Sequence, residues 1–406
     1  MKSSKIPILI LIFLLVAGCG GGGSGGSSSS PSASTPPPAQ AAENVLLVTV
    51  NGSLCSNNPS IINKACVSVT VCTPGTTNCQ TITDILLDTG SSGLRIFKQV
   101  LSVPLPQVAS GSGSLTECIQ FADNTSDWGP VQTASVILAN EPAVQVPIQV
   151  IDSTFGTPTQ CGIPHQNPTD AGYNGILGVG LFVQDCGPGC TSSPSNGVYY
   201  SCVASTCTGT AVALTSQVQN PVALLPQDNN GVIVQLPGVP SGGAPSVNGS
   251  LVLGIGTRSN NGPSGVAAYT VNQVGEFSTT FNATSYVGIL DTGSNGLFFN
   301  PPPATTGQLP NCPGGNAVWF CPSTTLDLSA TNTGASGSPS GTVPFQIGNF
   351  ESLFTSPGSN KVFNDIGGRT PGSLFDWGLP FFLGRNVFAG IEGKGSGLGT
   401  GPYWAY

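Results

Sequence analysis

The sequence is poor in charged residues. Asp, Glu, Lys and Arg make up 7% of its 406 residues, against roughly a quarter in an average soluble protein. The formal net charge is −8, and only ten residues are basic. Because nucleic-acid binding needs a concentrated basic surface, we expect no nucleic-acid partner.

Histidine is also scarce, and familiar cofactor motifs are missing. The one histidine, His165, lies in the segment CGIPHQNP, which is typical of a surface loop. A single histidine excludes a multi-histidine metal site, and no phosphate-binding GxxxxGK[ST] segment occurs. We therefore expect neither a metal nor a cofactor. An enzyme built on this chain would have to transfer protons with carboxylates.

Glycine and proline are abundant instead, with 56 and 35 residues. Short runs of Val, Ile, Leu and Thr recur between them, which predicts many strands joined by tight turns. The chain is too long for one hydrophobic core and suits two. We predict an all-β protein with an N-terminal lobe over residues 44–230 and a C-terminal lobe over residues 231–406.

The N-terminus is typical of an export signal, over residues 1–18. Lys2 and Lys5 precede an apolar run that is too short for a membrane span. The run ends in LVAGC, which looks like a bacterial lipobox and implies cleavage before Cys19 and lipidation of its thiol. Ordinary signal cleavage and an uncleaved anchor are the alternatives. Residues 19–43 then supply the lipidated Cys and a flexible tether rich in Gly, Ser and Pro.

This N-terminus predicts a location in the bacterial cell envelope. The protein would be a monomer that contacts the membrane through its N-terminal lipid. Gly20 follows Cys19, where some bacteria use Asp to retain a lipoprotein at the inner membrane. We therefore expect the outer membrane.

The cysteine content fits an exported chain. There are 13 cysteines, so an even number remains for disulfides once Cys19 is set aside. Neighbours in sequence are the first pairs to consider: Cys72–Cys79, Cys312–Cys321 and Cys55–Cys66. The pairing is more open for the rest, which are Cys118 with Cys161 and the group Cys186, Cys190, Cys202 and Cys207. Zinc binding by that group of four is the alternative, which an oxidising compartment disfavours.

One short motif occurs twice. Residues 86–94 read LLDTGSSGL and residues 289–297 read ILDTGSNGL, so Asp88 and Asp291 each follow an apolar pair and precede small residues. Some 90 residues beyond each motif, Gly178 and Gly384 each follow an apolar pair in turn. Similar intervals between similar motifs indicate duplication of one β unit.

These segments resemble the pepsin-like aspartic peptidases, in which each lobe carries a hydrophobic strand ending in DTG[ST] and a later apolar–apolar–Gly segment. The resemblance covers roughly residues 44–406 and includes GSLVLGIGT and FFLGRNVFAGIEG. It implies a bilobal pepsin-like acid-protease fold with two duplicated β-barrel-like lobes and a central cleft. The lipobox and tether add a similarity to poorly characterised exported bacterial lipoproteins.

The resemblance also implies roles for the motif residues. Asp88 and Asp291 would be the catalytic pair, because two carboxylates that share a proton supply a base and an acid together. The implied supporting residues are Thr89, Gly90, Ser91, Thr292, Gly293 and Ser294. The threonine hydroxyls would join the two loops, and the Gly N–H groups and Ser hydroxyls would donate to the carboxylates. Ordinary turn chemistry is the alternative for each of them.

The sequence departs from the family at the flap, a hairpin whose Tyr pairs with a Trp after DTGxxL. Arg95 occupies the Trp position, where a solvent-facing charge at the cleft rim is the alternative. Residues 118–138 would be the flap, with Phe121 and Trp128 as its aromatic candidates, unless both simply pack in a core. Arg385 follows Gly384, where the family commonly has Asp. Residues 20–42 contain no Lys or Arg, so we expect no basic pro-segment.

The sequence thus predicts an aspartic endopeptidase, tethered at the cell surface, that acts on a peptide or protein substrate. A catalytically silent pepsin-like binding or inhibitory module is one alternative, favoured by the altered flap. A structural envelope lipoprotein is another, and only the tether supports it.

Overall fold

The computed structural model describes residues 42–406 except 57, 59, 122–123, 157–160, 304 and 356–358. Strands make up 43% of the chain and helices 9%, which confirms the predicted all-β class. The expected signal, Cys19 and nearly all of the tether lie outside the described residues. Within the described residues, no helix is long and apolar enough to cross a membrane.

A sixteen-stranded sheet holds most of the first half of the chain. Across the sheet its strands are β11 (Thr206–Gly209), β10 (Tyr199–Val203), β6 (Gly113–Gln120), β7 (Ser126–Ile137), β8 (Val144–Ile151), β4 (Ser92–Phe97), β9 (Gly175–Val179), β3 (Cys79–Asp88), β2 (Ala65–Cys72), β1 (Val45–Val50), β13 (Val247–Leu253), β12 (Gly231–Leu236), β22 (Arg385–Gly390), β25 (Tyr403–Ala405) and β14 (Ala268–Thr270), with β5 (Ala109–Ser110) beside β6. The last five strands of this order follow residue 230. The sheet therefore crosses the boundary that we predicted between the lobes.

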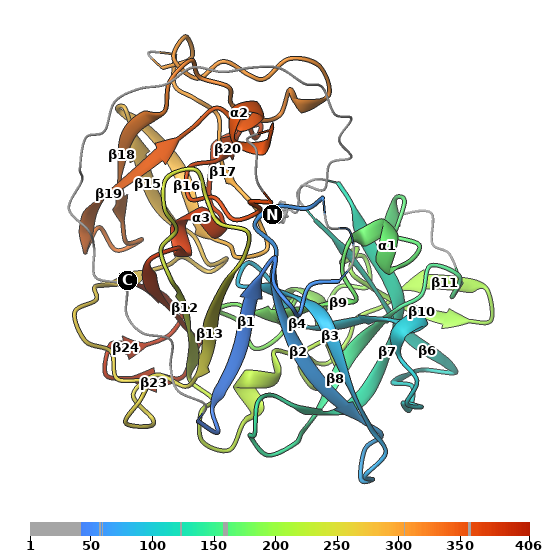
Figure 1. Ribbon diagram of the computed structural model, residues 1–406. Coiled ribbons are helices and arrows are strands. Elements are labelled where there is room, and N and C mark those ends of the chain that lie inside the picture. Colours follow the sequence, from blue (N-terminus) through green and yellow to red (C-terminus); the bar gives the residue numbers. More distant parts are fainter. Residues whose placement is uncertain are drawn as a thin grey trace.

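A second sheet of seven strands is built from the second half alone. Its order is β19 (Ser340–Ile347), β18 (Leu326–Thr333), β15 (Phe277–Phe281), β16 (Thr284–Leu290), β21 (Leu374–Trp377), β17 (Leu297–Phe299) and β20 (Gly367–Gly368). Figure 1 shows these orange and red strands grouped at one end of the molecule and the blue and green strands of the first half at the other.

The remaining elements are short. The pair β23 (Gly395–Ser396) and β24 (Gly399–Thr400) forms its own small ladder. The α-helices are α1 (Pro168–Ala171), α2 (Phe350–Thr355) and α3 (Leu379–Phe382). The 3₁₀-helices are η1 (Lys98–Val100), η3 (Gly187–Cys190), η4 (Leu214–Ser216), η5 (Pro221–Leu224) and η6 (Gly314–Asn316).

The two DTGS segments occupy the same kind of topology in each half. β3 pairs in parallel with β9, with Asp88 opposite Gly178, and β9 also pairs antiparallel with β4. Likewise, β16 pairs in parallel with β21, with Leu290 opposite Trp377, and β21 pairs antiparallel with β17. In both halves a later strand therefore lies between the two strands that flank the DTGS loop, which supports the inferred duplication.

This register corrects one prediction. The residue that corresponds to Gly178 is Gly378, directly after β21, and not Gly384, which precedes β22 of the other sheet with φ of 78°. The apolar–apolar–Gly pattern failed here because Asp376 and Trp377 precede Gly378. Arg385 therefore does not occupy the position where the pepsin-like family commonly has Asp. That position is Leu379, which follows Gly378.

All twelve cysteines of the described chain form disulfides. The three pairs close in sequence are present as predicted, and the others are Cys118–Cys161, Cys186–Cys190 and Cys202–Cys207. The group of four considered for zinc therefore makes two disulfides. Only Cys312–Cys321 lies in the second half.

The core differs between the two sheets. In the larger sheet, Val, Ile and Leu side chains fill most of the buried positions. In the smaller sheet aromatic rings dominate, and Phe299 stacks on Phe375 with ring centroids 4.6 Å apart. His165 was predicted to be a surface loop residue, and this was wrong: it is 8% exposed, and its Nδ1 lies 2.8 Å from Oδ1 of Asp127.

Candidate active site

The two DTGS loops meet in the structure. Asp88 ends β3, Asp291 directly follows β16, and neither side chain is exposed to solvent. A Cβ placed on Gly90 would lie 2.8 Å from Cγ of Asp291, and one placed on Gly293 would lie 3.0 Å from Oδ1 of Asp88. Each carboxylate thus rests against the glycine of the opposite loop, and only the missing side chains at these glycines leave room for it.

The threonines of the two loops join them through four hydrogen bonds. The Thr89 hydroxyl donates to the carbonyl of Leu290 at 3.0 Å and accepts from the N–H of Thr292 at 3.0 Å. The Thr292 hydroxyl donates to the carbonyl of Leu87 at 2.7 Å and accepts from the N–H of Thr89 at 3.1 Å. Both threonines are buried, so these bonds fix the loops rigidly against each other.

Each carboxylate accepts the same two local hydrogen bonds. The Gly90 N–H donates to Oδ1 of Asp88 at 2.7 Å, and the Ser91 hydroxyl donates to Oδ2. In the second loop, Gly293 N–H donates to Oδ1 of Asp291 at 2.7 Å, and the Ser294 hydroxyl lies 2.8 Å from Oδ2. The structure therefore brings together all eight motif residues that the sequence singled out.

A third carboxyl group, which sequence reasoning missed, lies behind the second loop. Oδ2 of Asp376, on β21, lies 2.6 Å from the Ser294 hydroxyl, and the side chain is fully buried. Its signal in the sequence was an acidic residue within the apolar run LFDW. Burial raises the pKa of the Asp291 carboxyl well above its usual range, and the neighbouring charge of Asp88 raises it further. A proton is therefore held at this site at pH values where an exposed Asp would be ionised.

A cavity of about 330 Å³ opens beside the paired loops. Thr89, Gly90 and Ser91 line it on one side, and Ile289 and Leu290 of β16 line it on another. The rest of the lining is mixed: it includes the apolar side chains of Ile119, Leu181, Phe182, Val274 and Trp404 and the polar or charged ones of Arg95, Gln120, Asp185, Gln273 and Glu392. This volume could hold a large side chain of a bound molecule.

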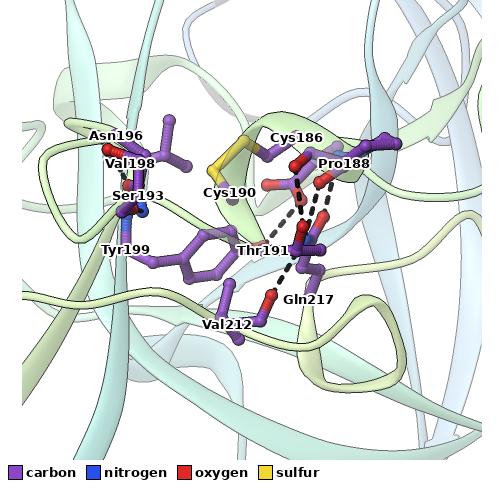
Figure 2. Close-up of a disulfide and its surroundings, with 12 residues drawn as sticks. Cys186, Pro188, Cys190, Thr191, Ser193, Asn196, Val198, Tyr199, Val212 and Gln217 are labelled. Carbon is purple, nitrogen blue, oxygen red and sulfur yellow. Dashed lines mark hydrogen bonds between the residues drawn. A yellow bond between two sulfur atoms is a disulfide. The ribbon is translucent and has the colours of Figure 1, made fainter.

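One wall of the cavity is a cross-linked loop. Figure 2 shows the Cys186–Cys190 disulfide closing this loop, with Gln217 beneath it. The Gln217 amide accepts from the N–H of Gly187 at 2.8 Å and donates to its carbonyl at 2.9 Å. Since Cys186, Gly187 and Pro188 line the cavity, these bonds give it a fixed wall.

Arg95 lies beside the cavity in a buried network of charged groups. Its guanidinium is fully buried, 2.7 Å from Oε1 of Glu117 on β6 and 3.3 Å from Oδ2 of Asp185. Tyr199 donates to Oδ1 of Asp185 at 2.6 Å. Burial raises the pKa of Asp185 well above its usual range, and Glu117 adds to this effect. Arg95 is therefore not the rim charge considered as an alternative, but a residue that holds β6 to the strand after the first loop.

The structure places neither flap candidate at the cavity. Phe121 is 2% exposed and packs in a core cluster with Phe97 and Tyr173. Trp128 is fully buried, and its Nε1 donates to the carbonyls of Phe155 and Gly156. Both aromatic side chains therefore pack in a core, which was the alternative to a role in the flap. The residue that faces Arg95 is Glu117, one position before the predicted flap segment.

A comparison with protein families gives a match that spans all the described residues. Residues 40–406 match the family described as "Protein of unknown function (DUF3443)". This chain belongs to the DUF3443 family. A search of curated proteins found no match for this DUF3443 chain.

Proposed function

We propose that this DUF3443 protein is an aspartic endopeptidase with a pepsin-like bilobal fold. The observation that carries the proposal is the pair of buried carboxylates, each lying against the glycine of the opposite loop and each accepting from a Gly N–H and a Ser hydroxyl. Two acids this close cannot both be ionised, so one holds a proton while the other accepts one. Their apparent pKa values belong to the pair.

The proposed reaction is hydrolysis of a peptide bond. The ionised carboxyl group of the pair accepts a proton from water while the water oxygen bonds to the peptide carbonyl carbon. The protonated partner donates its proton to the carbonyl oxygen, which gives a tetrahedral diol. A proton then passes to the amide nitrogen, the C–N bond breaks, and an amine and a carboxylic acid are released. The cavity beside Thr89 and Ile289 would hold one substrate side chain.

A peptide-library digest tests the proposal. The full chain is incubated with the library from pH 3 to pH 7, with and without a statine-type transition-state mimic. Asp88→Asn and Asp291→Asn should each lower cleavage by at least about a thousandfold, because each removes one partner of the proton transfer. Asp327→Asn is the matched control, since Asp327 is an exposed residue on β18.

Full cleavage by either active-site variant would overturn the mechanism. A second result would favour the silent binding module: no cleavage by the native chain, but binding of peptides that Asp88→Asn does not abolish. One observation favours that alternative: the buried Arg95–Glu117 pair stands where the pepsin-like peptidases have a Tyr–Trp pair.

We also propose that the protein is anchored to the outer membrane of a bacterial envelope by a lipid on Cys19. The sequence LVAGC and the tether that follows it support this. Replacement of Cys19 by Ser should move the protein from the detergent phase to the aqueous phase in a phase-partition assay. Unchanged partitioning would contradict the lipid anchor.

A further inference from the structure

Asp376 and Asp291 compete for one hydroxyl proton. The Ser294 hydroxyl lies 2.8 Å from Oδ2 of Asp291 and 2.6 Å from Oδ2 of Asp376. A serine hydroxyl carries a single hydrogen, so it can donate to only one of these oxygens. Both short contacts are hydrogen bonds only if one of the two carboxyl groups is protonated and donates to the serine oxygen.

The surroundings indicate that Asp376 is the protonated partner. Its side chain is fully buried, and its Oδ1 accepts no hydrogen bond from the described residues. Asp291, in contrast, accepts a bond on Oδ1 from Gly293 as well. A buried carboxylate with an unpaired oxygen is far more costly than a neutral carboxyl group. Among the described residues, no Lys, Arg or His forms an ion pair with Asp376.

The corresponding position in the first half, which the structure describes, has no such group. Asp376 lies opposite Ile289 in the β16–β21 ladder, and the corresponding position in the β3–β9 ladder is Ile176, opposite Leu86. Ile176 is fully buried in an apolar cluster. The two acids of the pair therefore receive the same direct hydrogen bonds, but, of the two serines, only Ser294 contacts a second carboxyl group among the described residues.

We propose that Asp376 is a positioning residue: it stays protonated, donates to Ser294, and thereby directs the Ser294 hydroxyl onto Asp291, which makes the two acids of the pair unequal. The chain runs from the Asp376 O–H to the Ser294 oxygen, and from the Ser294 O–H to Oδ2 of Asp291. Hydrogen bonds in such a chain strengthen one another. This inference rests on the proposed peptidase function for its kinetic consequence, but not for the protonation of Asp376.

The titratable groups that act on Asp376 are Asp291, which it reaches through Ser294, and Asp88, the other member of the pair. Burial raises the pKa of Asp376 well above its usual range, and the charge of Asp88 acts in the same direction. A protonated Asp376 stabilises the ionised form of the Asp88–Asp291 pair through Ser294. Replacing Asp376 removes that stabilisation. Both apparent pKa values of the pair should then rise.

Two variants test this with kinetics. Asp376→Ile, which installs the residue of the first half, should lower kcat about tenfold with little change in KM, and should move both limbs of the pH–rate profile upward by about half a pH unit. Asp376→Asn should recover most of the lost rate, because its amide can still donate to Ser294. A shift of both limbs to lower pH would show that Asp376 is ionised. That result, or unchanged kinetics in the Ile variant, would overturn the inference.

A direct titration separates this inference from the proposed function. In full-length protein labelled with ¹³C at the Asp carboxyl carbons, the Asp376 signal is identified by its loss in Asp376→Asn. It should keep the position of a protonated carboxyl group at pH values where an exposed Asp is already ionised. A midpoint near pH 4 would overturn the inference even in an active peptidase. A protonated Asp376 in a chain without peptidase activity would sustain it while the proposed function fails.

Discussion

The two DTGS loops are nearly identical at the carboxylates and differ one layer further out. At the first loop, Arg95 follows and joins Glu117, and Ile176 lies behind. At the second loop, Phe298 takes the place of Arg95, and Asp376 takes the place of Ile176. The short motif therefore determines the direct hydrogen bonds of each acid, whereas residues far away in sequence determine what surrounds those bonds.

The two halves are also stabilised by different means. Five of the six disulfides lie between residues 55 and 207. The second half relies on aromatic contacts, such as Phe375 against Trp377 with ring centroids 4.4 Å apart. One topology is thus held together by covalent links in one half and by ring packing in the other.

In the proposed peptidase, the largest loss of activity from a change outside the two acids should come from adding a methyl group where the loops meet. Gly90→Ala and Gly293→Ala should each lower kcat/KM about a hundredfold, because the new Cβ would displace the opposite carboxylate by about an ångström. Gly307→Ala is the control, since a Cβ there meets no atom within 4 Å. A near-native rate in either active-site variant would show that the loops are not as closely apposed as described.

Exchanging the residue after each loop tests the difference between them. Arg95→Phe, which copies the second loop, leaves Glu117 and Asp185 buried without their cation, so the free energy of unfolding should fall by about 3–5 kcal/mol. Adding Glu117→Leu should recover part of this loss. Urea unfolding of the two variants measures both effects. A neutral Arg95→Phe would mean that the buried network contributes nothing to stability.

The threonines test the symmetry of the pair. Thr89→Val and Thr292→Val keep the shape but remove two buried hydrogen bonds each, so each should cost about 2–3 kcal/mol of unfolding free energy. The double variant should cost less than the sum, because the four bonds form one network. A clearly larger loss of unfolding free energy in one single variant would show that the two threonines do not contribute equally to the contact between the loops.

Three buried acids should make the stability of the protein depend on pH. Burial raises the pKa of Asp185, Asp291 and Asp376 in the folded state above the unfolded value of about 4. The folded state therefore binds more protons above that pH, and stability falls as pH rises from about 4 towards the folded-state pKa values, by up to about 1.4 kcal/mol per pH unit for each group. The melting temperature should accordingly decrease from pH 4 to pH 7. An increase over that range would contradict the raised pKa values.

The sequence predicted the direct hydrogen bonds of each carboxylate because the residues that make them are local to a nine-residue motif. That the two motifs face each other was expected from the family resemblance alone. The sequence failed where the decisive contact comes from a distant strand. Glu117 was missed because its role depends on Arg95, 22 positions away. Asp376 was missed because an acid two positions before Gly378 does not fit the apolar–apolar–Gly pattern. The search for that pattern therefore led to Gly384 instead. The flap aromatics were misplaced because a sequence does not show which face of a hairpin turns towards a core.

The division of the strands between the two sheets was harder to predict for a related reason. β12 and β13 begin after residue 230 but pair with each other, and β13 pairs with β1. Hydrophobic periodicity predicts that such segments are strands, but it does not identify their partners. The prediction of an all-β chain held, whereas the partition of its strands between sheets came from long-range pairing.

The pairing of β1 with β13 has a consequence for the order of folding. β1 pairs with only two residues of β2, whereas all six of its residues are matched along β13. During synthesis, the whole edge of β1 that pairs with β13 therefore stays without its partner until the chain has grown past Leu253. Such an open edge invites pairing with other chains. We therefore expect a fragment ending before β13 to aggregate, and a fragment that includes β13 to be the shortest in which β1 is covered.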